Sequence, residues 1–207
     1  MCRRLGAKEM SEITDQTILT IDTGANVFKE ETIEPLPVYT DKHPMLSQRI
    51  PEYDVRNIGS PVLAKLIKRL KMTMKLHNGL GLSANQCGVF QRVFVIGSND
   101  FQLACINPKL IGISADLIKE NEGCLSYPGL YLKIERPKTI QVEFTAENGE
   151  IKQIELDGLT ARCFLHELDH MNGKKFVEYV GPVSLQTAKR KQEKLIKKMV
   201  RLNKHGV

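Results

Sequence analysis

Five consecutive residues, His166-Glu167-Leu168-Asp169-His170, carry the groups that metal-assisted proton transfer requires. On an α-helix, residues four positions apart point the same way, so both imidazoles can reach one ion. Glu167, beside the first histidine, can then reach a metal-bound water without binding the metal itself. Five-residue matches of this kind also occur on solvated helices. Here the histidines have apolar neighbours, which indicates a buried helix: Ala161, Phe164, Leu165 and Leu168.

Two histidines do not complete a catalytic site, because such sites use three protein ligands and keep one position open. After His170 the chain contains no histidine before His205, and Glu178 falls outside the spacing of the known helix-borne zinc sites. A general zinc endopeptidase would need a third ligand downstream of His170. The sequence therefore disfavours that activity and predicts a third ligand from elsewhere in the chain.

The segment Glu122–Pro128 offers Cys124 as that ligand. A cysteine that follows a glycine and precedes a proline turn is predicted to lie in a loop, where its thiolate could point into a pocket. The alternative is a buried free cysteine, the usual state of this residue. Other cysteines are weaker candidates, because they lie in apolar contexts or on the histidine helix itself: Cys87, Cys105 and Cys163.

A third cluster, Gly79–Gln86, follows the first predicted helix. Its glycines allow the backbone to come close to a ligand. The absence of a Gly-Lys-Ser/Thr sequence excludes a phosphate-binding loop. The segment is either an ordinary glycine-rich turn or a site in which Gln86 donates a hydrogen bond to a developing oxyanion.

Hydrophobic periodicity predicts the elements that position these clusters. Helical spacing covers residues 61–76, 159–171 and 184–203, and the first two helices end at Asn-Gly pairs. Asn148-Gly149 predicts a hairpin between two strands. The predicted strands are 92–96, 103–106, 130–134, 139–144 and 151–156. We therefore expect an α+β fold with antiparallel or mixed sheets packed around a central metal-binding helix, and with a C-terminal helix.

Composition sets further limits. The 207 residues, 42% apolar and 26% charged, suit one domain with extended ends. No apolar run is long enough to span a bilayer, and five scattered cysteines fit a reducing compartment, so we expect a cytoplasmic protein without membrane contact. The net charge of +6 is concentrated after Gly181, where eight lysines and arginines oppose only Glu193. Any polyanion contact is expected there.

Taken together and in this order, the three clusters resemble the peptide deformylase family. Its signatures are a Gly-x-Gly-Leu-x-Ala-x-Gln loop, a Glu-Gly-Cys-Leu-Ser loop and a His-Glu-x-x-His helix, and all three occur intact here. The resemblance runs from about Leu36 to the C-terminus. Joint occurrence by chance is far less probable than that of any single motif.

The resemblance implies a role for each matching residue. Cys124, His166 and His170 would bind the ion, Glu167 would be the general base, and Gln86 with the Leu125 N–H would form the oxyanion site. Substrate-binding positions are implied at Gly81, Leu80, Glu122, Arg162 and Cys163. The ion would be divalent, with Fe(II) as the native metal and zinc, nickel or cobalt as substitutes.

By the same resemblance, the function would be removal of the formyl group from the N-terminal formyl-methionine of nascent polypeptides, with release of formate. Partners would be N-formylmethionyl peptides and the ribosome, the latter through the basic C-terminal helix, and the protein would be a monomer. A charge run on a helix is also often only a solvated face. From another functional class, a metal-stabilised RNA-binding module without activity would have no use for Glu167.

The expected organisation is an N-terminal extension at 1–34, a catalytic domain at 35–183 and a basic helix at 184–207. Three positions depart from the family pattern. Leu165 replaces a common glutamine, Ser83 replaces a common alanine, and Tyr131 stands where some relatives carry an arginine that aids peptide binding. The first thirty or so residues match nothing in the family.

Overall fold

The first predicted helix is α1 (Pro61–Leu76) in the computed structural model, which describes residues 33–98 and 101–204. Ser60 caps it by accepting a hydrogen bond from the Leu63 N–H, and Pro61 occupies the first helical position. Asn78 has a left-handed backbone with φ of 51° and ends the helix. The predicted extension at 1–34 lies outside the described residues, apart from its last two.

The other predicted helices are also present. α2 (Gly158–Met171) carries the His-Glu-x-x-His motif and ends at Asn172 and the left-handed Gly173. α3 (Pro182–Lys204) begins two residues earlier than expected. Short 3-10 helices occupy four turns: η1 (Pro44–Ser47), η2 (Val55–Asn57), η3 (Ala84–Cys87) and η4 (Phe176–Tyr179).

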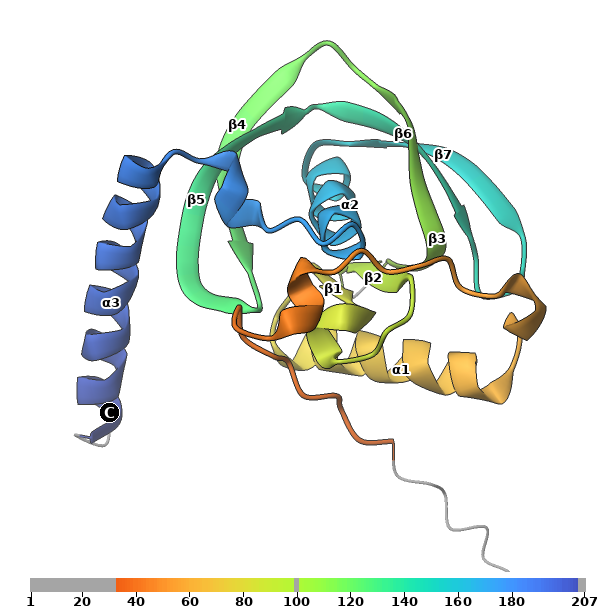
Figure 1. The fold of residues 1–207 in the computed structure, drawn as a ribbon, viewed down its shortest axis with the longest axis horizontal. Helices are drawn as coiled ribbons and strands as arrows, with labels where there is room; N and C mark the ends of the chain where they lie inside the picture. The colour runs from red at the N-terminus through yellow and green to blue at the C-terminus, as the bar shows by residue number, and fades with distance from the viewer. Residues whose placement is uncertain (1–32, 99–100, 205–207) are drawn as a thin grey trace, which may run out of the picture. The chain divides into compact units, whose positions relative to one another are not determined.

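Two antiparallel sheets complete the fold of the described residues, which confirms the α+β class (Figure 1). The five-stranded sheet has the order β1-β2-β3-β6-β7, and the second sheet pairs β4 with β5. The strands are β1 (Gly81–Ser83), β2 (Val93–Gly97), β3 (Gln102–Ile113), β4 (Leu117–Cys124), β5 (Tyr127–Pro137), β6 (Thr139–Thr145) and β7 (Ile151–Asp157). The Asn148-Gly149 hairpin joins β6 to β7 as predicted.

Two strands, β1 and β4, were not predicted, and the Cys124 segment was expected to be a loop. β3 and β5 are longer than the predicted strands 103–106 and 130–134. Cys124 is instead the last residue of β4, opposite Tyr127, at a register shift in the hairpin. The turn is therefore only Leu125 and Ser126, which gives the cysteine a more rigid support than a loop would.

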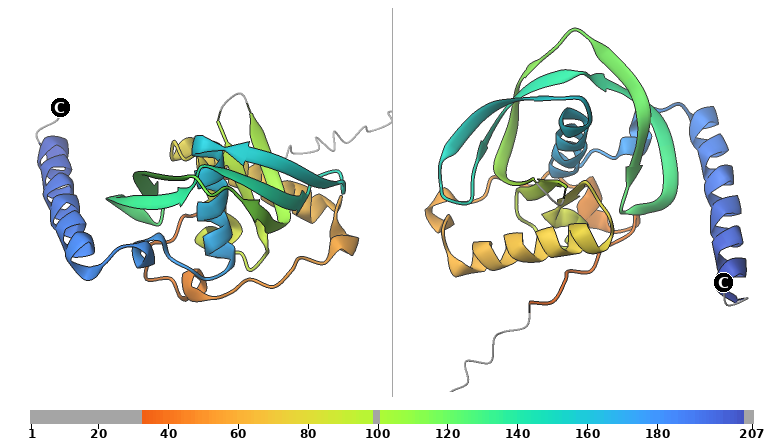
Figure 2. Two further views of the ribbon diagram at one scale, coloured as in Figure 1. Left: turned by 90° about the horizontal axis from the view of Figure 1, so that it is seen from above. Right: turned by 180° about the vertical axis from the view of Figure 1, so that it is seen from behind.

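The helix α2 lies between the sheets, and α1 covers the β1-β2 end of the larger sheet (Figures 1 and 2). One core cluster joins α2 to this sheet, and its buried members include Phe94, Ile96, Val142, Phe164 and Met171. A second cluster packs α1 on β1 and β2, with Leu70, Met74, Leu82 and Val95 among its members. Full burial of each large apolar side chain contributes about 1.5–3 kcal/mol, so α2 is held firmly where it carries its histidines.

A smaller cluster fixes the β4-β5 hairpin. Tyr127, Leu130, Leu132 and Ile134 of β5 pack on Phe176 of η4, and Leu185 and Ala188 of α3 contact the same cluster. The first turns of α3 therefore pack on the hairpin through these two apolar residues. None of the described helices combines the length and the hydrophobicity that crossing a bilayer would require.

Candidate metal centre

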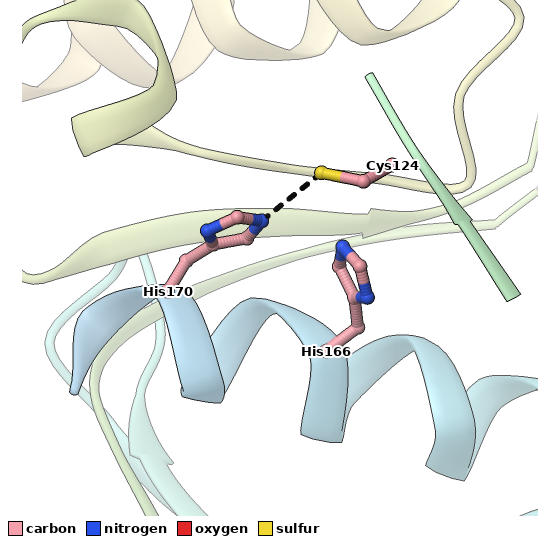
Figure 3. Close-up of side chains that lie close together, drawn as sticks. All are labelled: Cys124, His166 and His170. Atoms are coloured by element: carbon pink, nitrogen blue, oxygen red, sulfur yellow. Dashed lines mark hydrogen bonds between the residues drawn. The ribbon is translucent and has the colours of Figure 1, made fainter. Parts of the chain in front are cut away.

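Three side chains from two elements meet at one point (Figure 3). His166 and His170 project from the same face of α2, and Cys124 reaches them from the end of β4. One potential ligand atom from each residue lies within 4.8 Å of the others, and Cys124 Sγ is 3.3 Å from His170 Nε2. A thiolate and two imidazoles are a donor set that suits Fe(II) or zinc. The residues therefore fit a divalent transition metal.

The carboxylate of Glu122 orients the first histidine. Its Oε1 atom lies 2.7 Å from His166 Nδ1, so the ring presents Nε2 toward Cys124. Arg136 binds the same carboxylate through two nitrogens at 2.6 and 2.8 Å, and Arg162 Nη1 lies 3.2 Å away. Burial opposes the charge on Glu122, but the hydrogen bonds from Arg136 and His166 prevail and lower the pKa of Glu122 to about 2.

The two imidazoles differ in their surroundings. Burial, together with the nearby His166 ring, lowers the pKa of His170 well below its usual range, so His170 is neutral, the form that binds metals. Burial also opposes charge on His166, but hydrogen bonds to Cys124 and Glu122 raise the pKa of His166 well above its usual range. Metal ligands must be deprotonated, so metal binding would release a proton from this cluster.

Glu167 lies beside the same centre. It is 3% exposed, and its Oε2 atom has no hydrogen-bond partner among the described residues. Burial raises the pKa of Glu167 to about 7, although the neighbouring His166 imidazole opposes the shift. A carboxyl group with a pKa near neutrality can both accept and return a proton.

The glycine at position 81 makes room for this carboxylate. A side chain there would collide with Glu167 Oε1 and would also crowd Cys163 Sγ. The Cys163 thiol in turn donates to the backbone oxygen of Leu80 at 3.0 Å. Glycine at position 81 therefore lets the β1 backbone lie directly against the functional face of α2.

The side chain of Gln86 has a fixed orientation. Its Oε1 atom accepts hydrogen bonds from the N–H and the hydroxyl of Ser83, at 2.9 and 2.8 Å. Its Nε2 atom therefore points the other way, 3.4 Å from Cys124 Sγ and 3.2 Å from Ser126 Oγ. The donor end of this amide is directed at the metal centre.

An extended segment before η1 ties two of the three motifs together. The Tyr39 N–H donates to the Gln86 carbonyl at 2.8 Å, and the Asp41 N–H donates to the Ser126 carbonyl at 3.0 Å. Sequence reasoning did not assign this segment a role. Both contacts are made by backbone groups, so the identities of the residues do not predict them.

A cavity of about 660 Å³ opens onto the centre. The walls come from the segment around β1, the β4-β5 hairpin and α2, and include Leu80, Gly81, Glu122, Leu125, Tyr131, Arg162, Cys163 and Glu167. Leu80 and Tyr131 at the rim are exposed. The cavity is large enough for an apolar side chain together with the backbone of a short peptide.

Comparison with known proteins agrees with this geometry. The family model described as polypeptide deformylase matches residues 35–186. The chain belongs to the peptide deformylase family. It is similar to the peptide deformylase of Acinetobacter baumannii, with 35% identity over 167 residues that cover 76% of this chain and 94% of the relative. The Thermotoga maritima enzyme is 37% identical over 144 residues, or 63% and 88% of the two chains.

Solved deformylase structures share the fold. A Synechococcus elongatus deformylase in complex with actinonin superposes with a TM-score of 0.71 and 35% identity, over 77% of this chain and 86% of that one. A Legionella pneumophila deformylase gives 0.72 and 30% identity over 81% and 98%. The chain is thus a metal-dependent hydrolase that removes the N-terminal formyl group from nascent polypeptides.

The deformylase structure brings together most of the residues singled out from sequence. Cys124, His166 and His170 meet, with Glu167 and Gln86 beside them. The residues predicted to bind substrate all line the cavity: Leu80, Gly81, Glu122, Arg162 and Cys163. The carboxylate of Glu122 is, however, fully engaged with His166 and two arginines. Leu165, the residue before the first histidine, is buried in the core cluster that joins α2 to the five-stranded sheet.

Sequence reasoning missed Arg136. It is 3% exposed, and besides Glu122 it contacts Asp169 at 2.9 Å and the Tyr179 hydroxyl at 3.2 Å. A signal was present, because Leu130, Leu132, Ile134 and Arg136 alternate along β5 and so share its buried face. A buried arginine needs an acidic partner, and Glu122 on the adjacent strand provides it.

Proposed function

We propose that this deformylase holds one divalent metal ion with Cys124, His166 and His170 and uses Glu167 as its general base. The convergence of the three ligand atoms within 4.8 Å carries the proposal. The buried, unpartnered Oε2 atom of Glu167 supports the second part, because an acceptor in this position is suited to a reacting water.

The chemistry follows from the positions of these groups. A bound divalent ion would lower the pKa of a water molecule and so supply a nucleophile near neutral pH. Glu167 accepts the proton of that water as it attacks the formyl carbon. The same buried carboxyl group then delivers the proton to the departing amine, and formate is released.

The formyl oxygen gains negative charge during the attack. The Nε2 donor of Gln86, held by Ser83 on its other end, is oriented toward the centre and stabilises this charge. The backbone N–H of Leu125, the residue after Cys124, is the second donor. Loss of one such donor typically costs about 3–4 kcal/mol of transition-state stabilisation.

For the native metal we propose Fe(II), with zinc, nickel or cobalt able to replace it. One thiolate softens the site and lowers its net charge, which suits Fe(II) as well as zinc. An Fe(II)–thiolate centre is sensitive to oxidation. Protein purified without oxygen should therefore contain iron and lose activity in air, and metal analysis before and after exposure tests this.

For the substrate, we propose that the methionine side chain enters the 660 Å³ cavity and that the peptide backbone pairs with Gly81. Leu80 and Cys163 form one wall beside it. Glu122 and Arg162 form the other wall. They are paired with each other and stay paired when the side chain enters. The cavity then accepts an apolar side chain without leaving a buried charge unpaired.

The decisive experiment is hydrolysis of formyl-Met-Ala-Ser by the Ni(II)-loaded protein. We expect the Glu167→Ala variant to retain one metal ion per chain and to lose activity by about 10²–10⁴-fold. Glu155→Gln, an exposed carboxylate on β7, is the matched control. Equal activity of Glu167→Ala and wild type would refute the role of Glu167 as general base. Loss of the metal from Glu167→Ala would show that Glu167 is needed for metal binding, which contradicts the proposed ligand set.

We further propose that the basic C-terminal segment, residues 184–207, contacts the ribosome. From Lys189 onward the described part of α3 is strongly basic, and its apolar Leu195, Ile196 and Val200 are exposed. Deleting residues after 183 should weaken sedimentation with ribosomes more than it reduces hydrolysis of formyl-Met-Ala-Ser. Equal loss of both would favour a purely structural helix.

Two further proposals concern the state of the protein. A monomer is expected, and light scattering at micromolar concentration tests it. A cytoplasmic location is supported by the four described cysteines, all free thiols, and by the substrate, which arises at the ribosome. Fractionation of cells tests the location.

A further inference from the structure

A second and larger cavity lies between α3 and the outer face of the β4-β5 hairpin. Its volume is about 1010 Å³. The helix is held against the hairpin by Leu185 and Ala188, and the Gln192 side chain donates to the Pro128 carbonyl at 2.7 Å. Figure 2 shows α3 alongside the β4-β5 hairpin. The catalytic assignment gives this cavity no role.

The two cavities are neighbours. Asn121, Gly129 and Tyr131 line both of them, so this part of the hairpin forms their common boundary. The Tyr131 ring lies against Gly123, the residue before Cys124, where a side chain would approach Tyr131 Cε1 to 2.8 Å. Tyr131 is 64% exposed and lies at the junction. A chain that leaves the metal centre past Tyr131 therefore enters the second cavity.

The second cavity is basic. Lys119, Lys133 and Lys191 line it, and none of them forms an ion pair with another described residue. Glu135 is the acidic residue among the lining side chains, opposite Lys119 in the strand register. Three lysines against one acid leave a net positive groove at the exit of the site.

The distances along β4 set which substrate residues reach these lysines. Lys133 is paired with Asn121, three residues from Cys124, and Lys119 is five residues from Cys124. At about 3.3 Å per residue, these positions lie about 10 and 17 Å along the strand from the cysteine. An extended peptide with its formyl-methionine at the metal would pass them with its fourth to sixth residues.

From the adjacency of the two cavities and the charge of the second one, we propose that the groove binds residues four to six of the formylated chain and that the enzyme favours acidic side chains there. The inference rests on the proposed function of the metal centre and extends its substrate preference. The exposed Tyr131 ring offers a flat surface at the entrance, and the lysines that attract the peptide lie further along the hairpin.

The exposure of the groove lysines sets the expected size of the preference for acidic peptides. Contacts between exposed charges contribute little individually and are screened by salt, so the preference should be severalfold and not absolute. Three peptides with amidated C-termini test it: formyl-Met-Ala-Ser followed by three glutamates, three serines or three lysines. At low ionic strength we expect kcat/KM for the glutamate peptide to exceed that for the lysine peptide at least fivefold. In about 0.5 M salt the ratio should fall below twofold.

A pair of double variants separates the groove from net charge. Lys119→Glu with Lys191→Glu reverses two lining residues, whereas Lys197→Glu with Lys198→Glu makes the same charge change on exposed residues of α3 outside the lining. We expect the first variant to abolish or invert the glutamate preference and the second to retain it. Equal rates on the three peptides in wild type, or an unchanged preference in the first variant, would overturn the proposal.

Failure of this proposal is distinguishable from failure of the proposed function. Formyl-Met-Ala-Ser is too short to reach Lys119, so its hydrolysis reports the metal centre alone. Binding of fluorescent, unformylated Met-Ala-Ser-Glu-Glu-Glu, measured by anisotropy, reports the groove without catalysis. Tighter binding of this peptide than of its lysine counterpart supports the groove whatever the catalytic result, and equal affinity contradicts it.

Discussion

The Nδ1 atom of His166 lies 2.7 Å from Oε1 of Glu122, and both groups are buried. The same carboxylate pairs with Arg136 and Arg162, so one acid supports a proposed metal ligand and contacts two buried cations. Glu122 thus connects the stability of the β4-β5 hairpin to the orientation of the imidazole on α2.

Replacing this carboxylate should therefore affect both properties. In Glu122→Gln we expect the free energy of unfolding to fall by about 3 kcal/mol or more. The reason is that Arg136 and Arg162 lose their shared buried partner and keep only Asp169 and Glu120, respectively. Metal affinity should fall by about 10–100-fold, the usual effect of losing a group that orients a metal-bound histidine. Urea unfolding of the metal-free protein and a metal titration measure the two effects. Unchanged values, as expected for the control Glu155→Gln, would contradict the role of Glu122.

The oxyanion donor can be tested without disturbing its support. Gln86→Glu keeps an acceptor for Ser83 but removes the amide donor, and Gln86→Ala removes both. We expect kcat on formyl-Met-Ala-Ser to fall by about 10²–10³-fold in both variants. Metal content should be unchanged. If Gln86→Glu retained wild-type kcat, the donor would have to be another group.

The lack of room for a side chain at position 81 can also be tested by substitution. Gly81→Ala would push a methyl group against Glu167 and Cys163, and small displacements of catalytic groups are costly. We expect kcat/KM to fall at least tenfold and the free energy of unfolding to fall by about 1–3 kcal/mol. Gly181→Ala is the control, since a side chain there meets no atom within 4 Å and the backbone is not left-handed. Similar kinetics for both variants would remove the steric argument.

Metal removal should change the reactivity of one cysteine in particular. Cys124 is partly exposed at the cavity, whereas burial raises the pKa of Cys87 to about 12 and raises the pKa of Cys105 well above its usual range. After chelation, iodoacetamide should modify Cys124 at least tenfold faster than in the metal-loaded protein, because a metal-bound sulfur is protected. Cys87 and Cys105 should stay unmodified in both states. Peptide mapping by mass spectrometry measures each site, and protection of Cys124 that is independent of metal would count against its role as a ligand.

The sequence predicted the elements whose signals lie within a few residues of one another. It did not predict elements that depend on contacts with distant parts of the chain. The helix Pro61–Leu76 was predicted with correct bounds, because its apolar spacing, Ser60 cap and Asn78 stop are all encoded nearby. β4 was missed because most of its side chains are exposed and polar. Glu122 is buried there only because Arg136, Arg162 and His166 are brought to it by the fold.

The site shows the same division. Ligand types and spacing, together with the family resemblance, were enough to group Cys124 with His166 and His170, and the structure places them together. The direction of the Gln86 amide, set by Ser83, could not be read from residue types. Neither could the second cavity, because its lysines come from two strands and a helix that are distant in sequence.

The proposed ligands of the metal centre come from separate layers of the fold: one terminates the small sheet, and two lie on the helix that packs against the large one. A bound ion would therefore add a further cross-link between the β4-β5 hairpin and α2, which the Glu122–His166 hydrogen bond and the Arg136–Asp169 and Arg162–Glu122 ion pairs already join. A partly synthesised copy that ends before His170 lacks the complete ligand set. Metal binding should thus require the β4-β5 hairpin and α2 to have come together in each new enzyme molecule, so that a copy can process other nascent chains only after these two elements have docked.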